Sequence, residues 1–263
     1  MITVNQAERC ASSPSTNDHL VNLYARALHG IDPAMLDNSL QERTLYKGLS
    51  GLFLSSAPDG YEHAKNRIMV VGRETRGWNV LKNDPYDGLE DYIRRSVALH
   101  SSFQKSQQSR PLAKGCTFFN FMRAVAETSG RDGLIWANLF CFDFNRTNPM
   151  LGPHADIVKH YSELLLKAQI EALKPDIVIF ANGASSAKVR AAYFPYKGME
   201  RVCFNSRNFT DHGISEKQLW TFEMADGLQS YRIQHPSAIS KQARAAREYL
   251  VRLLPVARLS CAG

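Results

Sequence analysis

The chain has 263 residues, of which 44% are hydrophobic and 22% are charged, and no apolar run approaches the ~20 residues that cross a bilayer. Lysine and arginine outnumber aspartate and glutamate by 32 to 25, so the formal net charge is +7 and a polyanionic partner such as nucleic acid is favoured. Residues 1–20 show no charged-then-apolar secretory leader. We therefore expect a cytoplasmic monomer with no membrane partner.

The N-terminal quarter of the chain predicts a helical extension. Residues 1–20 are polar and read as a loose arm, whereas residues 20–55 carry apolar side chains at helical spacing. We expect a helical extension, 1–60, packed on a core domain, 61–263.

Four strand-like runs follow, at 67–72 (RIMVVG), 134–140 (LIWANLF), 176–181 (DIVIFA) and 231–234 (YRIQ). The first three are almost continuously apolar, which is typical of parallel strands that are covered on both faces. Weaker strand candidates lie at 201–205 and 219–223.

Helical patterns alternate with these strands. They lie at 117–129, before Gly130, at 155–173, and at 240–254, where Ser240 opens a basic amphipathic helix. The alternation predicts an α/β fold. We expect a three-layer sandwich with a mostly parallel four-stranded central sheet flanked by helices, plus the N-terminal helical elaboration.

Ligands of open α/β sheets gather where the strands end, so the residues that follow each strand are the candidates for a site. Those residues are Arg73, Glu74 and Arg76 after the first run, Asn138 in the second, Asn182 after the third, and His235, Pro236 and Ser237 after the fourth. If the fold prediction holds, these residues meet at the edge of the sheet where the parallel strands end. This edge, the rim, then carries a carboxylate, two carboxamides and an imidazole.

Three of these features occur in an order that resembles the uracil-DNA glycosylase superfamily. A strand ends at Gly72 with Glu74 two positions on, a later strand ends at Asn138, and a late strand leads into the HPS triplet 235–237. The resemblance covers roughly residues 65–250. It implies a water-positioning residue at Glu74, a residue that reads the base edge at Asn138, and a histidine that faces the base oxygen O2 at His235.

The middle of the chain is similar to the iron–sulfur branch of that superfamily, through Cys141, the run NRTNP (145–149) and the run QIEALKP (169–175). The partner cysteines of a cluster are missing, and Ser162 falls roughly where one would stand. A cluster needs four thiolates within reach. The five cysteines are scattered without a CxxC pair, and the histidines show no HExxH spacing, so we expect no metal and no cofactor.

Two further departures concern specificity. The main branch carries a tyrosine four positions after the motif glycine, which excludes the methyl group of thymine, whereas Arg76 stands here. Glu74 is longer than the aspartate or asparagine of the family. The resemblance therefore implies a pocket open to a base bulkier than uracil, such as a modified cytosine.

The chemistry of base excision assigns a task to each residue. The target nucleotide must be flipped out of the duplex. A carboxylate, Glu74, would hold water below the cationic sugar. His235 would donate to the base oxygen as it becomes anionic, and Asn138 would pair with the base edge.

The remaining candidates would hold the flipped base and the DNA. Stacking on the base is expected from Tyr86, twelve residues after Glu74, or from Trp78. Contacts to DNA, double- or single-stranded, are expected from the motif loops and the last helix. These DNA-contacting candidates are Arg73, Arg76, Ser237, Ile239 (as a wedge), Lys241 and Arg244.

The leading hypothesis is a monofunctional DNA glycosylase for an aberrant or modified pyrimidine, acting in repair or in phage defence. Each residue also has a structural interpretation: Glu74 paired with Arg73 or Arg76, Asn138 capping a strand, His235 in a turn, and Trp78 or Tyr86 in the core. Two alternatives stay open. One is a superfamily member that binds DNA without catalysis, and the other is an α/β enzyme that handles nucleotides, although GxGxxG and GxxxxGK[ST] motifs are absent.

Overall fold

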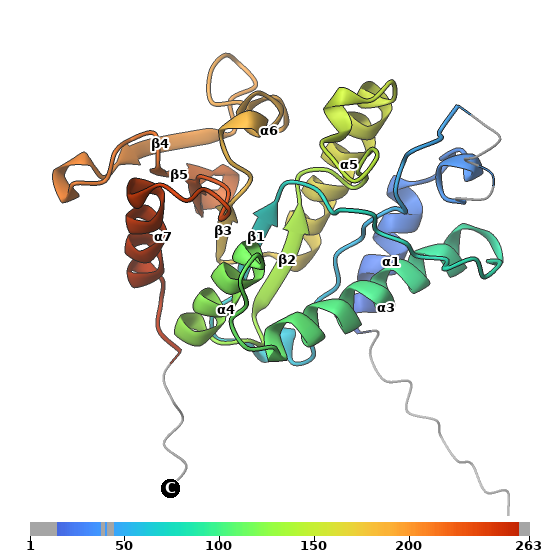
Figure 1. The fold of residues 1–263 in the computed structure, drawn as a ribbon, viewed down its shortest axis with the longest axis horizontal. Coiled ribbons are helices and arrows are strands. Elements are labelled where there is room, and N and C mark those ends of the chain that lie inside the picture. Colours follow the sequence, from blue (N-terminus) through green and yellow to red (C-terminus); the bar gives the residue numbers. More distant parts are fainter. Residues whose placement is uncertain (1–14, 38–39, 41–44, 258–263) are drawn as a thin grey trace, which may run out of the picture.

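The computed structural model describes residues 15–37, 40 and 45–257, so the expected loose arm lies mostly outside the described residues. A central sheet is flanked by helices (Figure 1). The helices are α1 (Thr16–Ala27), α3 (Gly88–Ser109), α4 (Thr117–Ser129), α5 (Ala155–Leu173), α6 (Ala187–Tyr193) and α7 (Lys241–Leu253). The strands are β1 (Ile68–Gly72), β2 (Leu134–Asn138), β3 (Ile177–Phe180), β4 (Cys203–Asn208), β5 (Leu219–Met224) and β6 (Leu228–Ile233). None of the described helices is both long and apolar enough to cross a membrane.

The sheet confirms the α/β class but corrects its size. It has six strands in the order β2-β1-β3-β6-β5-β4, so the expected four-stranded sheet was wrong. The four strongest candidates form its parallel part, β2-β1-β3-β6. The two weaker candidates, β5 and β4, add an antiparallel ribbon. A tight connection through Asp226 and Gly227, both at positive φ, reverses the chain between β5 and β6, which makes this part antiparallel.

The parallel strands end at one rim. β1 and β2 are fully buried, and their register pairs Gly72 with Asn138. β3 lies on the other side of β1 and pairs with β6 in turn. Because neighbouring parallel strands point the same way, the segments that follow β1, β2, β3 and β6 emerge on the same side of the sheet.

Three helices confirm the sequence pattern. α4 ends at Gly130, which has φ +99°, and α5 has the predicted bounds. α7 begins after Ser240, whose Oγ accepts a hydrogen bond from the Ala243 N–H at 3.1 Å. α4 and α7 pack against each other beside the sheet, and α1 packs against both α3 and α5 (Figure 1).

The N-terminal extension is helical only in part. After α1, residues 49–57 form a buried, irregular segment rather than the expected helix. The Phe53 N–H donates to the Cys141 carbonyl at 2.8 Å, and the Gly51 N–H donates to the Trp78 carbonyl at 2.6 Å. The run of apolar residues that resembled a helix face therefore lies in the core, bonded to the segments that follow β1 and β2.

Helix α3 supplies the partners for the free edge of strand β2. The Gln104 side chain donates to the Leu134 carbonyl at 2.7 Å and accepts from the Trp136 N–H at 2.9 Å. His100 Nε2 contacts the Trp136 carbonyl at 2.9 Å, while its Nδ1 accepts from the Ser56 N–H, so Nε2 is the donor. An edge strand otherwise exposes unpaired backbone groups. These side chains satisfy them inside the protein.

We expect Gln104→Leu to lower the free energy of unfolding by about 2–4 kcal/mol, because it leaves one buried carbonyl and one buried N–H unpaired. Urea unfolding measures this loss. Lys105→Leu, on the next position and exposed, is the matched control and should change stability by less than about 0.5 kcal/mol. Equal stabilities of the two variants would refute this role of Gln104.

Candidate functional site

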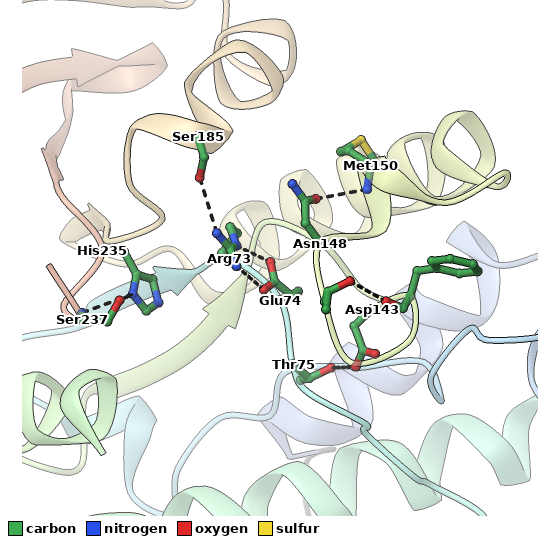
Figure 2. A network of polar contacts seen from close by, with 11 residues as sticks. Arg73, Glu74, Thr75, Asp143, Asn148, Met150, Ser185, His235 and Ser237 are labelled. Carbon is green, nitrogen blue, oxygen red and sulfur yellow. Dashed lines mark hydrogen bonds and ion pairs between the residues drawn. The ribbon is translucent and has the colours of Figure 1, made fainter. Parts of the chain in front are cut away.

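The loop that follows β1 is held in place by the buried carboxylate of Asp143. Its Oδ2 accepts from the Gly77 N–H at 2.6 Å and from Thr75 Oγ at 3.2 Å, and its Oδ1 accepts from the Arg146 N–H at 2.8 Å. Figure 2 shows Asp143 and Thr75 beside the Arg73–Glu74 pair. Sequence reasoning did not select Asp143. A lone acidic residue between two phenylalanines after a buried strand was the signal available.

Glu74 lies at the rim but is paired with its neighbour Arg73. The Glu74 side chain is 3% exposed and that of Arg73 is 25% exposed. Arg73 Nη2 contacts Oε1 at 2.6 Å, and Nε contacts Oε2 in a second short hydrogen bond. This contact with Glu74 raises the pKa of Arg73. The ion pair that was the structural interpretation of Glu74 is thus present, with Arg73 as its partner.

Asn138 is buried and incompletely hydrogen-bonded. Its Oδ1 accepts from Trp136 Nε1 at 3.1 Å, but its buried Nδ2 has no partner among the described residues. A Cβ on Gly72 would lie 2.5 Å from Asn138 Oδ1 and 3.1 Å from the Phe118 ring, so only glycine fits there. The glycine at the end of β1 therefore makes room for the Asn138 side chain.

A second buried carboxamide follows strand β3. Asn182 is completely buried, and neither its Nδ2 nor its Oδ1 has a partner within the described parts of the chain. The next residue, Gly183, lies against His235, because a Cβ there would meet the His235 Cβ and backbone nitrogen at 3.2 Å. Asn182 and His235 therefore belong to the same rim.

His235 is held as a neutral imidazole with a defined tautomer. The Ser237 N–H donates to Nδ1 at 3.2 Å, and the Ser237 hydroxyl lies 2.7 Å from the same nitrogen (Figure 2). Nδ1 is therefore the acceptor, so Nε2 carries the proton. Burial, then the positive charges of Arg73, Arg76 and Arg247, lower the pKa of His235 to about 4.

We expect the imidazole of His235 to stay neutral far below the ordinary histidine pKa of 6.5. Because the folded pKa is depressed, the unfolded chain binds more protons between pH 6.5 and about 4. The stability contribution is full above pH 6.5 and is lost as the pH falls toward 4. An NMR titration of the His235 ring protons measures this, and a midpoint near 6.5 would contradict it.

The aromatic ring that stacks on His235 is Phe118 rather than the predicted Trp78 or Tyr86. The Phe118 ring stacks on His235 with centroids 6.2 Å apart at an angle of 19°. Trp78 is 8% exposed and packs edge-on against three other core rings, whereas Tyr86 packs against Tyr92. The structure thus brings neither predicted stacking residue to the strand ends. The sequence did not predict a role for Phe118, because this residue lies in helix α4 rather than after a strand.

The expected DNA-contacting residues lie in two segments, the loop after β1 and the loop and helix after β6. Arg76, Ser237, Lys241 and Arg244 are exposed, and the Ile239 side chain is 78% exposed. Beside them a groove of about 460 Å³ runs along the junction of α4 and α7. The groove is lined by Thr117, Asn120, Phe121, Ala124, Pro236, Arg244, Arg247, Glu248 and Val251. Arg247 also donates to the Ala238 carbonyl at 3.0 Å, which holds the HPS loop against α7.

Cys141 is a buried thiol that contacts the Ser162 hydroxyl. Ser162 Oγ donates to Cys141 Sγ at 3.2 Å, and burial raises the pKa of the thiol to about 12. Ser162 thus lies beside Cys141, where the resemblance to the iron–sulfur branch would place a partner cysteine. Within the described residues, no group of three or more histidine, cysteine or acidic side chains is placed to hold a metal ion.

Neither the models of known protein families nor the curated proteins match this chain.

Proposed function

We propose that this chain is a DNA glycosylase that flips an aberrant or modified pyrimidine out of DNA and hydrolyses its N-glycosidic bond. The observation that carries the proposal is the Asn138 amide. A buried N–H left unpaired costs about 1–3 kcal/mol. That cost is explained if a ligand supplies the acceptor, and O4 of uracil or N3 of a cytosine is such an acceptor.

His235 supports the same reaction. Its protonated Nε2 makes no hydrogen bond to the described residues, and the ring is neutral. A neutral N–H donor stabilises a base oxygen that becomes anionic as the bond breaks. The Phe118 ring, which lies beside both His235 and Gly72, supplies the apolar surface on which a flipped base can stack.

Glu74 fits the remaining task through the two oxygens that Arg73 orients. A carboxylate offers about four lone-pair sites, and Arg73 uses two of them. The remaining sites can hold a water and stabilise positive charge on the sugar. Arg73 also contacts Ser185 Oγ at 3.4 Å, so the loop after β1 is linked to the loop after β3.

The residue at position 76 bears on the size of the base that the site can accept. Arg76 is exposed where a methyl-excluding tyrosine would stand, so the proposal covers uracil and bulkier modified cytosines. Such an activity would serve DNA repair or defence against phages with modified bases. The exposed cations of α7 and the exposed Ile239 would hold the backbone and fill the gap in the stack.

A base-release screen tests this proposal. Single- and double-stranded oligonucleotides carrying uracil, hypoxanthine, xanthine or a modified cytosine are incubated with the protein and then treated with alkali. We expect strand breaks at the position of uracil or of a modified cytosine. Oligonucleotides that all remain intact would refute the enzymatic proposal.

The Arg73–Glu74 ion pair favours one second candidate, a member of the fold that binds DNA without excising a base. A carboxylate whose charge is compensated stabilises a sugar cation less well. Tight, salt-sensitive binding to the same oligonucleotides without alkali-sensitive sites would identify this function.

A further inference from the structure

A second cavity lies away from the proposed active site, between α6 and the ribbon of β4 and β5. Its volume is about 480 Å³, which is within the range of small-molecule pockets, about 300–1,000 Å³. Its lining includes four cationic side chains, Arg190 and Arg232 among them, five aromatic rings, Trp220 and Phe222 among them, and no acidic side chain.

Arg190 is the most unusual of these side chains. Its Nη1 is buried and has no hydrogen-bond partner in the part of the chain that the structure describes. The guanidinium lies 6.0 Å from the centroid of the buried Phe180 ring. Burial, then the positive charge of Arg232, lower the pKa of Arg190 to about 10, so it remains charged at neutral pH.

Arg232 places a second charge in the same cavity. Its Nη1 donates to the Lys217 carbonyl at 2.9 Å, and the guanidinium lies 5.9 Å from the Trp220 ring centroid. Burial lowers its pKa. No described carboxylate pairs with Arg190 or Arg232. Two neighbouring cations that are partly removed from water and lack a counter-ion destabilise the fold, unless an anion binds between them.

The aromatic side chains of the cavity indicate which kind of anion it binds. Phe222 and Trp220 present ring surfaces, and the buried Nε1–H of Trp220 has no partner among the described residues. A nucleobase that packs beside the Phe222 ring can accept that in-plane hydrogen bond at its polar edge. Paired guanidinium groups in turn match the geometry of a phosphate.

We propose that this cavity binds a nucleoside phosphate, with the phosphate between Arg190 and Arg232 and the base against Trp220. The ligand is either a free nucleotide or a nucleotide at the end of a DNA strand, and the two share this chemistry. The site is independent of the glycosylase proposal, because none of its lining residues belongs to the rim around His235.

Calorimetric titration tests the site with four probes: inorganic phosphate, deoxycytidine, deoxycytidine monophosphate and a short single-stranded oligonucleotide. We expect the monophosphate to bind more tightly than phosphate or the nucleoside alone. Competition between the oligonucleotide and the monophosphate would identify a strand end as the source, and its absence would identify the free nucleotide. Failure of the monophosphate to saturate the protein would overturn the proposal.

Variants localise the binding. Arg190→Gln and Arg232→Gln should each weaken monophosphate binding by at least about tenfold, since each removes a charge-assisted contact. Without ligand, Arg190→Gln should raise the thermal midpoint, because it removes a buried, unpaired charge. Arg26→Gln, at an exposed position of α1, is the matched control and should keep the wild-type affinity for the monophosphate. Unchanged affinity in both cavity variants, with the fold intact, would overturn the proposal.

Discussion

Replacing His235 with alanine is expected to slow base release by about 10²–10³-fold, the effect typical of losing one donor to a developing oxyanion. The residue lies at a turn and not in the core, so the thermal midpoint should change little. Because the Nε2 donor acts mainly in the transition state, the rate of the chemical step should fall while DNA affinity remains. Single-turnover base release with saturating enzyme measures this.

Two variants control that result. His29→Ala replaces an exposed histidine in the turn after α1 and should leave the rate unchanged. Ser237→Ala removes the hydroxyl that lies against Nδ1 and should cause a smaller loss than His235→Ala, because the backbone N–H still contacts the ring. A wild-type rate in His235→Ala would show that the imidazole takes no part in the reaction.

Changing Glu74 to glutamine is expected to reduce base release by at least about 100-fold. The amide keeps the size of the side chain and one acceptor for Arg73, but it loses the negative charge that stabilises the sugar cation. Glu216→Gln, at an exposed position, serves as the control and should retain full activity.

Variants of Arg73, the ion-pair partner of Glu74, separate a positioning role of the arginine from a role of its own. If Arg73 only orients Glu74, Arg73→Gln should lower activity less than Glu74→Gln, and the double variant should be no worse than Glu74→Gln alone. Additive losses would show that the arginine acts separately, for example on DNA. Full activity in Glu74→Gln would contradict its assignment and favour a purely structural ion pair.

Much of the sheet could be predicted because its strands are nearly uniform apolar runs. Helix α3 could not, since the face it buries is partly polar. Ser96, His100, Gln104 and Gln107 are buried there, in part as partners for the edge of β2. Strand β4 gave only a weak strand pattern, because five of its six residues are exposed and it therefore lacks a buried apolar run.

The candidate site was predictable as far as it depends on strand ends. Gly72, Asn138 and His235 follow from that rule, and the register of β1 with β2 places the first two side by side. Phe118 and Asp143 were not predictable, because their positions depend on how α4 and the loop after β2 pack. Trp78 follows a strand, yet its ring turns into the core between Phe53 and Phe103.

The most direct test of the account is whether one nucleobase touches Asn138 and His235 together. An NMR experiment that observes the Asn138 side-chain amide and the His235 ring nitrogens, during titration with free uracil and with an abasic oligonucleotide, measures this. The account predicts that both groups shift in step with uracil and saturate at the same concentration. Shifts at neither group, or at the residues around Arg190 alone, would contradict it.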